Sequence, residues 1–364
     1  MERVHNFCAG PCTLPVSVIQ ELAAELPDFE RSGMSLIEMS HRDPVYDRVH
    51  HETLDLLRRL YAVPEDFSIL LLQGGATLQF AMVPMNLLAT DEAGAGRRAG
   101  YVVSGSWGKK ALDDAAAFGG YPAWDGAEEH YARMPTATEL VIDDGTRYVH
   151  VTSNETIGGI RLPEFYHLDV RQVGDMSSDY LTRTIPWDRF DLVYGGAQKN
   201  LGPAGLTVVF VRDSVLDEVP GSIPSYLRYQ THATTDSLAN TPPVFAIWAT
   251  GKVLRWIEAN GGVGGMQTRA AQRSAMVYDT IDGSGGFYRS PVDVACRSHT
   301  NVVFRLGSND LEDRFLTEAE QAHLMNLKGH RSVGGVRASI YNALPTESVD
   351  TLVDFMERFA ADNG

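Results

Sequence analysis

Short apolar runs recur along the first two thirds of the chain, and most of them end at glycine, serine, threonine or asparagine. A dozen or more residues separate most of these runs, and the intervals 78–88 and 109–118 have the apolar spacing of helices. This alternation predicts an α/β protein whose mostly parallel sheet is covered by helices on both faces. The predicted strands are residues 68–72, 100–103, 148–151, 169–173, 190–194 and 206–211.

The pattern changes near residue 242, where longer amphipathic stretches begin. Pro242 and Pro243 precede a predicted helix at 244–259, which Asn260 and two glycines end. We therefore expect a large domain over residues 16–260 and a smaller α+β domain over 261–364, closing over a cleft. In the smaller domain the pattern predicts helices at 267–281, 308–319 and 346–359 and strands at 300–306 and 336–339.

The charge of the chain restricts its partners. Its 364 residues carry a formal net charge of −16, which disfavours nucleic acids and anionic membranes because long-range repulsion slows their approach. No apolar run is long enough to span a bilayer, and residues 1–6 lack the apolar region of a signal peptide. We therefore expect a cytoplasmic protein.

The chain contains three cysteines, Cys8, Cys12 and Cys296. Three cysteines do not make a disulfide framework, and no residues near Cys8 and Cys12 supply the spacing of metal ligands. We expect reduced thiols and no metal site.

Candidate chemistry follows the predicted strands, where ligands bind in open α/β sheets. The turn Gly74-Gly75-Ala76-Thr77 opens a helix, so its free N–H groups suit a phosphate, although such a turn also serves as a tight connection. It has neither the spacing of a Walker loop nor that of a GxGxxG fingerprint. Lys199 lies in a glycine-rich loop between two apolar strands. If its amine is held away from water it is a nucleophile candidate, and otherwise it is a solvated loop lysine.

Two basic clusters stand out in this acidic chain. One is Ser40-His41-Arg42, and the other is Lys328-Gly329-His330-Arg331, which Arg337 follows. Each could bind an anionic ligand, although for either cluster alone the balance of surface charge is the more common role.

Seven strings of residues, in order from residue 7 to residue 343, carry a resemblance to a known family. They are Phe7-Cys8-Ala9-Gly10-Pro11, Glu38-Met39-Ser40-His41-Arg42, Gly74-Gly75-Ala76, Asn154-Glu155-Thr156, residues 195–203, Asn240-Thr241-Pro242-Pro243 and residues 328–343. The chain resembles the phosphoserine aminotransferase family, class V members of the fold-type I enzymes that use pyridoxal 5′-phosphate. The resemblance implies that fold, a homodimer with shared active sites, and an N-terminal segment (1–15) that joins the small domain to the cleft.

The resemblance also implies roles for individual residues around the cofactor. Lys199 would bind the cofactor covalently and then carry the proton during amino transfer. Asp175 would pair with the ring nitrogen, Trp107 would stack on the ring, and Thr156 would hydrogen-bond the ring hydroxyl. The cofactor phosphate would be bound by Ala76, Thr77 and Gln198, and by Asn240 and Thr241 of the neighbouring subunit.

For the substrate, the resemblance implies that Arg337 binds the α-carboxylate. The phosphate or γ-carboxylate would be bound by His41, Arg42, His330 and Arg331, some of them across the dimer interface. The reaction would be a ping-pong exchange between glutamate and 3-phosphohydroxypyruvate in serine biosynthesis, with 4-phosphohydroxy-L-threonine as a further substrate in pyridoxine biosynthesis. Thr77 stands where some members have arginine, and Cys8 stands where serine is expected.

Three other functions compete with this interpretation. A cysteine desulfurase would have a catalytic cysteine on a mobile loop and commonly histidine before the lysine, whereas here Gln198 precedes Lys199 and Cys296 has no glycine-rich loop. A non-catalytic carrier of pyridoxal phosphate would not need Arg337 and two His-Arg pairs. A Rossmann oxidoreductase would need the absent GxGxxG fingerprint.

Overall fold

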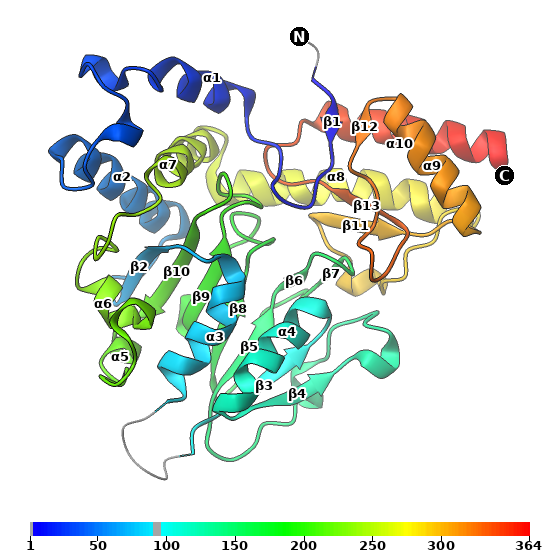
Figure 1. The fold of residues 1–364 in the computed structure, drawn as a ribbon. Coiled ribbons are helices and arrows are strands. Elements are labelled where there is room, and N and C mark those ends of the chain that lie inside the picture. The colour runs from blue at the N-terminus through cyan, green and yellow to red at the C-terminus, as the bar shows by residue number, and fades with distance from the viewer. Residues whose placement is uncertain (1–2, 90–95) are drawn as a thin grey trace.

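A seven-stranded sheet forms the centre of the computed structural model, which describes residues 3–89 and 96–364 (Figure 1). Its strands lie in the order β2, β10, β9, β8, β5, β3 and β4. Only β10 runs antiparallel to its neighbours β2 and β9, so the predicted mostly parallel sheet is confirmed. The strands are β2 (Phe67–Leu72), β3 (Arg98–Val103), β4 (Gly120–Asp125), β5 (Thr146–Thr152), β8 (Arg171–Asp175), β9 (Phe190–Gly196) and β10 (Thr207–Arg212).

Helices cover both faces of this sheet because its strands are apolar on both sides. Along β2, Leu70 and Leu72 belong to the core under α3 (Gly75–Leu87) and α4 (Ser106–Ala115). Ile69 and Leu71 point the opposite way, into the core under α2 (Pro44–Tyr61) and α7 (Val244–Ala259). Successive side chains of a strand alternate between faces, so a strand buried on both sides reads as one continuous apolar run.

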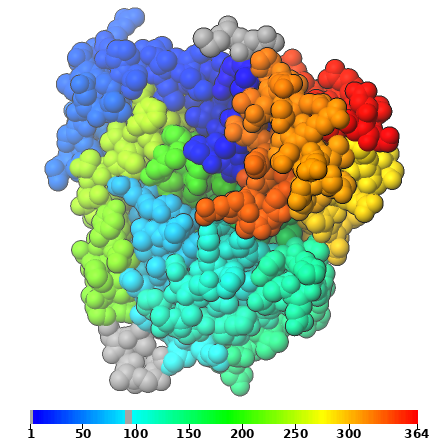
Figure 2. Space-filling model, turned by 45° about the vertical axis from the view of Figure 1, so that its right-hand side comes forward, coloured from blue at the N-terminus to red at the C-terminus, as the bar shows by residue number. Residues whose placement is uncertain are grey.

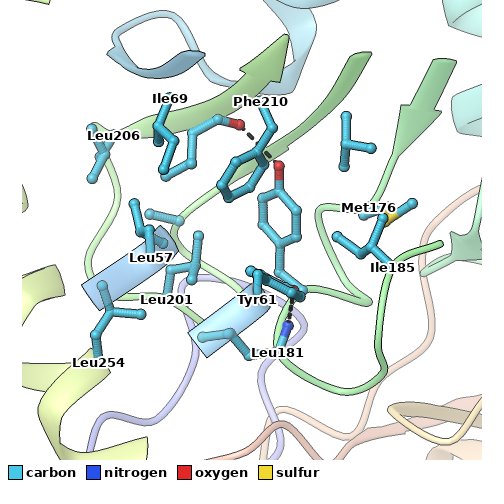
Figure 3. Packing of buried hydrophobic residues seen from close by; sticks show 14 of the residues in the cluster. Leu57, Tyr61, Ile69, Met176, Leu181, Ile185, Leu201, Leu206, Phe210 and Leu254 are labelled. Atoms are coloured by element: carbon cyan, nitrogen blue, oxygen red, sulfur yellow. Dashed lines mark hydrogen bonds between the residues drawn. The ribbon is translucent and has the colours of Figure 1, made fainter. Parts of the chain in front are cut away.

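The core under α2 and α7 packs around Tyr61 and Phe210 (Figure 3). The rings of these two residues meet edge to face at 5.7 Å, and Leu254 of α7 belongs to the same cluster. The Tyr61 hydroxyl accepts the N–H of Leu181, and its burial therefore leaves no unpaired polar group. This contact fixes the loop after β8 against the helical layer, at the end of the sheet where the predicted site residues lie.

The small domain has its own core, which includes Phe304, Phe315 and Phe355. Its strands β11 (Asn301–Phe304) and β13 (Val336–Ser339) pair antiparallel. The N-terminal β1 (His5–Asn6) pairs in parallel with β12 (Leu324–Met325). The helices of this domain are α8 (Gly262–Gly283), α9 (Asn309–Gln321) and α10 (Thr346–Asn363).

Helix α8 contributes to both cores. Val263 and Met266 pack in the large-domain core, and Val277 and Ile281 pack in the small-domain core. The chain thus passes from one core to the other within a continuous helix, so the boundary between residues 260 and 261 stays a prediction.

Local interactions and strand pairing set the ends of individual elements. Helix α2 begins at a cap, where the Asp43 side chain accepts the Val45 N–H at 2.8 Å. The predicted strand at 169–173 is shifted, since β8 ends at Asp175. No helix in the described ranges is long and apolar enough to cross a membrane. Besides short 3-10 helices, the other elements are α1 (Val16–Glu25), β6 (Asn154–Glu155), β7 (Ile160–Arg161), α5 (Asp213–Leu216) and α6 (Tyr229–Ala233).

Candidate active site

One pocket opens at the carboxyl ends of β5, β8 and β9 and the start of α3, where ligands bind in parallel sheets. It brings together seven of the predicted site residues, which lie far apart in the sequence. The lining residues are Gly75, Ala76, Thr77, Trp107, Thr152, Asn154, Thr156, Asp175, Ser177, Ser178, Gln198 and Lys199.

Lys199 follows β9 and is only 8% exposed. Its Nζ donates to Thr156 Oγ1 at 3.0 Å. Burial lowers the pKa of the amine to about 8, with the positive charge of Arg337 acting in the same direction and Asp175 opposing it. The N-terminal segment closes over the lysine stem, since a Cβ on Gly10 would lie 3.1 Å from Lys199 Cδ. A lysine held in this way has a much larger neutral fraction near neutral pH than an exposed lysine and can act as a nucleophile or base.

Asp175 ends β8 and is buried in the same pocket. One of its carboxylate oxygens accepts the Ser177 N–H at 3.0 Å and the Ser177 hydroxyl at 2.7 Å. Burial raises the pKa of this carboxyl, while the hydrogen bonds from Ser177 and the charge of Lys199 oppose the rise. Among the described residues no arginine or lysine forms an ion pair with it. A cationic group in the pocket would therefore stabilise its ionised form.

Helix α3 presents an anion site to the pocket. Gly74 precedes the helix with φ 91°, and a Cβ at that position would lie 2.5 Å from Leu78 Cδ2. Leu78 is the first residue whose N–H makes a helical hydrogen bond, to the Gly74 carbonyl at 3.3 Å. The N–H groups of Ala76 and Thr77 thus lie at the positive end of the helix dipole, an arrangement that suits a phosphate.

Trp107 is held in place by Glu155, a residue to which we assigned no role from the sequence. The carboxylate of Glu155 accepts the N–H of Gly108 at 2.7 Å and that of Trp107 at 3.1 Å, and so caps α4. Glu155 is completely buried, and burial raises the pKa of its carboxyl to about 7 despite these N–H donors. The sequence shows Glu155 within a motif, but its partners lie nearly fifty residues earlier in the chain and no local pattern links them.

The second basic cluster lies near this pocket. Arg337 Nη1 donates to the Thr156 carbonyl at 3.4 Å, and burial lowers the pKa of its guanidinium. His330 Nδ1 lies 2.7 Å from Ser332 Oγ. Partial burial and the charges of Arg337, Arg331 and Lys110 lower the pKa of His330. Cations from both domains therefore gather around this part of the molecule.

The first basic cluster lies elsewhere on the same chain. Thr241 Oγ1 is 3.4 Å from His41 Nδ1, and both Thr241 and Asn240 are exposed. None of His41, Arg42, Asn240 and Thr241 lines the pocket that contains Lys199. The structure thus brings His41 next to Thr241, and these four predicted residues do not line the pocket, nor do His330, Arg331 and Arg337.

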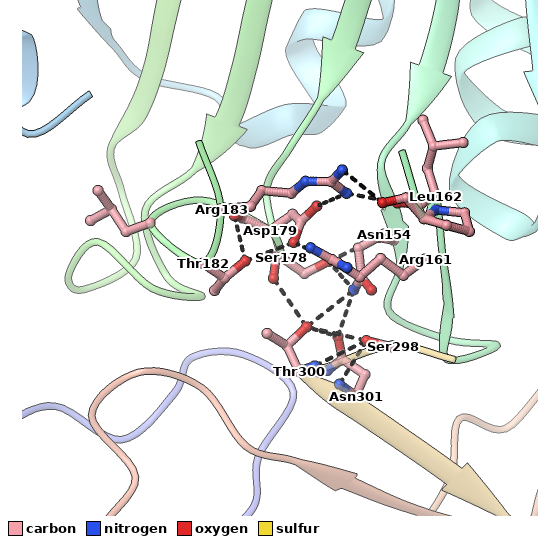
Figure 4. A network of polar contacts seen from close by, with 12 residues as sticks. Asn154, Arg161, Leu162, Ser178, Asp179, Thr182, Arg183, Ser298, Thr300 and Asn301 are labelled. Carbon is pink, nitrogen blue, oxygen red and sulfur yellow. Dashed lines mark hydrogen bonds and ion pairs between the residues drawn. The ribbon is translucent and has the colours of Figure 1, made fainter. Parts of the chain in front are cut away.

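A buried polar network joins the floor of the pocket to the small domain (Figure 4). Asn154 Nδ2 donates to Ser178 Oγ and to Asn301 Oδ1, both at 2.8 Å. Next to it, Asp179 pairs with Arg161 at 3.4 Å and with Arg183 at 3.3 Å. Asn154 and Ser178 line the pocket, so the network fixes the pocket floor relative to β11.

The set of groups can hold a planar aromatic ligand that carries a phosphate and a basic ring nitrogen. Trp107 offers a ring face, Asp175 a buried carboxylate, Lys199 a poised amine and α3 its N-terminus. The buried oxygen Oδ1 of Asn154 also has no hydrogen-bond partner within the described chain. These observations match the donors and acceptors that pyridoxal phosphate requires.

Comparison with known proteins gives consistent results along the whole chain. A sequence profile described as Aminotransferase class-V matches residues 4–352. Phosphoserine aminotransferase from Niallia circulans is 47% identical, with 100% of this chain and 99% of that protein covered. The Bacillus subtilis phosphoserine aminotransferase is 44% identical over the full length of both chains.

Solved structures agree. Phosphoserine aminotransferase from Bacillus circulans subsp. alkalophilus superposes with a TM-score of 0.96 at 46% identity, covering 100% of both chains. The PLP-bound phosphoserine aminotransferase from Trichomonas vaginalis superposes with a TM-score of 0.92 at 33% identity, covering 98% of this chain and 100% of that one.

Proposed function

The chain belongs to the class-V aminotransferase family, and from this premise we propose that it is a pyridoxal-phosphate-dependent phosphoserine aminotransferase. It exchanges an amino group between glutamate and 3-phosphohydroxypyruvate, giving 2-oxoglutarate and 3-phosphoserine. The observation that carries the proposal is one pocket that joins a buried lysine of lowered pKa, a buried carboxylate, a tryptophan and a free helix N-terminus. Relatives with this activity in their names match the full length of the chain.

The residues of the pocket fit the cofactor at separate points. The N–H groups of Ala76 and Thr77, with Gln198, would bind its phosphate, and Trp107 would lie against its ring. Thr156 would hydrogen-bond the ring hydroxyl. Asp175 would hold a proton on the ring nitrogen. The protonated nitrogen would in turn give the buried carboxylate the ion-pair partner that it lacks among the described residues.

When bound, pyridoxal phosphate supplies an electron sink and a carrier for the amino group. Lys199 would hold the cofactor and would then move the proton at the substrate Cα, a task suited to an amine with a pKa of about 8. The packing of Gly10 against the lysine stem keeps the amine directed into the pocket and away from bulk water.

The substrates share an α-carboxylate and a second anionic group. Arg337 lies beside Thr156 at the pocket and would bind the α-carboxylate with its planar fork. His330 and Arg331 would bind the phosphate or γ-carboxylate. 4-Phosphohydroxy-L-threonine carries the same two anionic groups, so we include it as a substrate, which would connect the enzyme to pyridoxine biosynthesis. If 4-phosphohydroxy-L-threonine leaves the spectrum of the bound cofactor unchanged, it is not a substrate.

We further propose a homodimer in which each subunit completes the pocket of the other. His41, Arg42, Asn240 and Thr241 do not line the pocket of their own chain, and His41 lies next to Thr241. Two large apolar side chains near them in sequence, Ile37 and Phe245, are 49% and 42% exposed. An exposed apolar surface beside anion-binding residues supports a subunit interface.

The three free thiols fit a cytoplasmic, reducing location, which fractionation of cells would test.

The proposed reaction is tested by the visible spectrum of the purified protein with its cofactor. Adding glutamate alone should remove the long-wavelength absorbance of the bound cofactor, and adding 3-phosphohydroxypyruvate should restore it. The Lys199→Ala variant, which keeps the other pocket residues, should bind the cofactor but show neither change. A wild-type spectrum that glutamate leaves unmoved would refute the aminotransferase assignment.

A further inference from the structure

Lys110 is a cation near the pocket that neither the motifs nor the proposed reaction uses. Its Nζ lies 4.4 Å from the centre of the Trp107 ring. The two residues are three positions apart on α4 and therefore occupy the same face of the helix. Within the described residues no carboxylate forms an ion pair with Lys110. Its neighbour Lys109 differs, because it pairs with Asp113 at 3.2 Å.

The charge of Lys110 faces the basic segment of the small domain. Its field is one of those that lower the pKa of His330, together with the fields of Arg337 and Arg331. Figure 2 shows the deep-orange segment around residue 330 lying against the cyan and teal surface formed by residues around 75–115. The two domains thus bring like charges together, and within the described part of the chain no carboxylate forms an ion pair with Lys110, His330, Arg331 or Arg337. Such a cluster attracts anions, and a bound anion would relieve the repulsion among its charges.

A phosphate requires more donors than a carboxylate does. Two oxygens of a carboxylate are satisfied by one arginine fork, whereas a phosphate has a third oxygen and a charge near −2. Lysine supplies a compact, rotatable charge with three donors, which suits an oxygen that the planar forks leave free. Lys110 is placed to supply that additional charge beside Trp107.

We propose that Lys110 binds the phosphate of the phosphorylated substrate and distinguishes that substrate from glutamate. This inference rests on the proposed function and assigns a further specificity residue to the same pocket. Lys110 contributes to the affinity of 3-phosphoserine and 3-phosphohydroxypyruvate and little to that of glutamate and 2-oxoglutarate, whose second anionic group is a carboxylate.

The test measures equilibrium binding to the enzyme with its cofactor, by calorimetric titration with two unreactive probes. The first probe is 3-phosphoglycerate, which carries the phosphate, and the second is glutarate, which carries two carboxylates. In Lys110→Met the dissociation constant for 3-phosphoglycerate should rise about tenfold, while that for glutarate should change by less than about twofold. Lys110→Arg, which keeps the charge, should retain most of the affinity. Lys109→Met is the matched control and should bind both probes as the wild type does.

Two results would overturn the inference. One is unchanged 3-phosphoglycerate affinity in Lys110→Met. The other is an equal loss for both probes with an altered cofactor absorbance, which would mean that Lys110 only supports the Trp107 ring. Failure of the proposed function is a separate result, because then the wild-type protein itself would not convert 3-phosphoserine.

Discussion

At the scale of single residues, Glu155 shows how a buried carboxyl supports the site. Its carboxyl is completely buried and accepts the N–H groups of Trp107 and Gly108, so it holds the start of α4. Burial raises its pKa to about 7, above the ordinary value of 4.5. The folded protein therefore binds this proton more tightly than the unfolded chain does.

This shift predicts a pH dependence of stability for the cofactor-free protein. The contribution of protonated Glu155 is fully present below pH 4.5 and is lost as pH rises through about 7. Glu155→Gln removes that titration. Relative to the variant, the wild type should lose up to about 3 kcal/mol of unfolding free energy between pH 5 and pH 8. Urea unfolding at the two pH values checks this, and parallel changes in both proteins would contradict it.

The sequence predicted site residues that lie in or near short sequence motifs. It missed residues whose role depends on contacts between distant parts of the chain. Lys199 lies in one of the strings that carry the resemblance, and Asp175 was predicted near the end of a strand, with the role that the resemblance implies. The structure places both in one pocket. Glu155 acts on α4, and Lys110 meets Trp107 on a helix face directed toward the small domain. Helical spacing places Lys110 beside Trp107. The contact of Glu155 with α4 and the approach of Lys110 to the small domain are not encoded locally, because they arise only when the elements pack.

At the scale of elements, the buried ion pairs beside the pocket floor support the loop after β8. Asp179 pairs with Arg161 of β7 and with Arg183, and its side chain is 0% exposed. Burial alone would raise the pKa of this carboxyl, but the two guanidinium groups outweigh burial and lower it. Its stabilising contribution is therefore present above pH 3.8 and is lost as pH falls below that value.

Asp179→Asn should be strongly destabilising because it leaves two buried guanidinium groups without their counter-charge. The expected loss is about 3–5 kcal/mol of unfolding free energy. Glu218→Gln is the matched control, because Glu218 also pairs with two arginines but has a side chain 44% exposed, so about 1 kcal/mol or less is expected. Denaturant titration of both variants measures the difference. Equal losses would show that burial does not set the strength of these pairs.

Element boundaries were predicted well where a cap or a proline marks them. The helix at 244–259 begins after two prolines and was predicted with the bounds of α7. The strand predicted at 169–173 was wrong by two residues, because Gly174 and Asp175 continue the ladder beside Val151 and Thr152 of β5. Pairing with a neighbouring strand, which a single segment does not encode, decides where β8 ends.

At the scale of the whole molecule, the distribution of anion-binding residues predicts a site shared between two chains. Arg337 lies near Lys199, whereas His41 and Arg42 lie beside Thr241, outside the pocket of their own chain. In a two-fold symmetric dimer the same surface meets itself, so one chain can present Arg42 to the pocket of the other. Mixing two inactive variants distinguishes this arrangement from a site built within one chain.

The two variants are Lys199→Ala, which lacks the nucleophile, and Arg42→Gln, which lacks a cation proposed to serve the partner. If Arg42 acts across the interface, a mixed dimer has one pocket with both Lys199 and a partner Arg42. Random exchange of equal amounts should then restore about a quarter of the wild-type activity, since half of the dimers are mixed and each has one complete pocket. If Arg42 acts within its own chain, no pocket is complete in any dimer and activity should stay at the level of the separate variants. Arg337→Gln mixed with Lys199→Ala is the control. Arg337 contacts Thr156 of its own chain, so this pair should give no recovery.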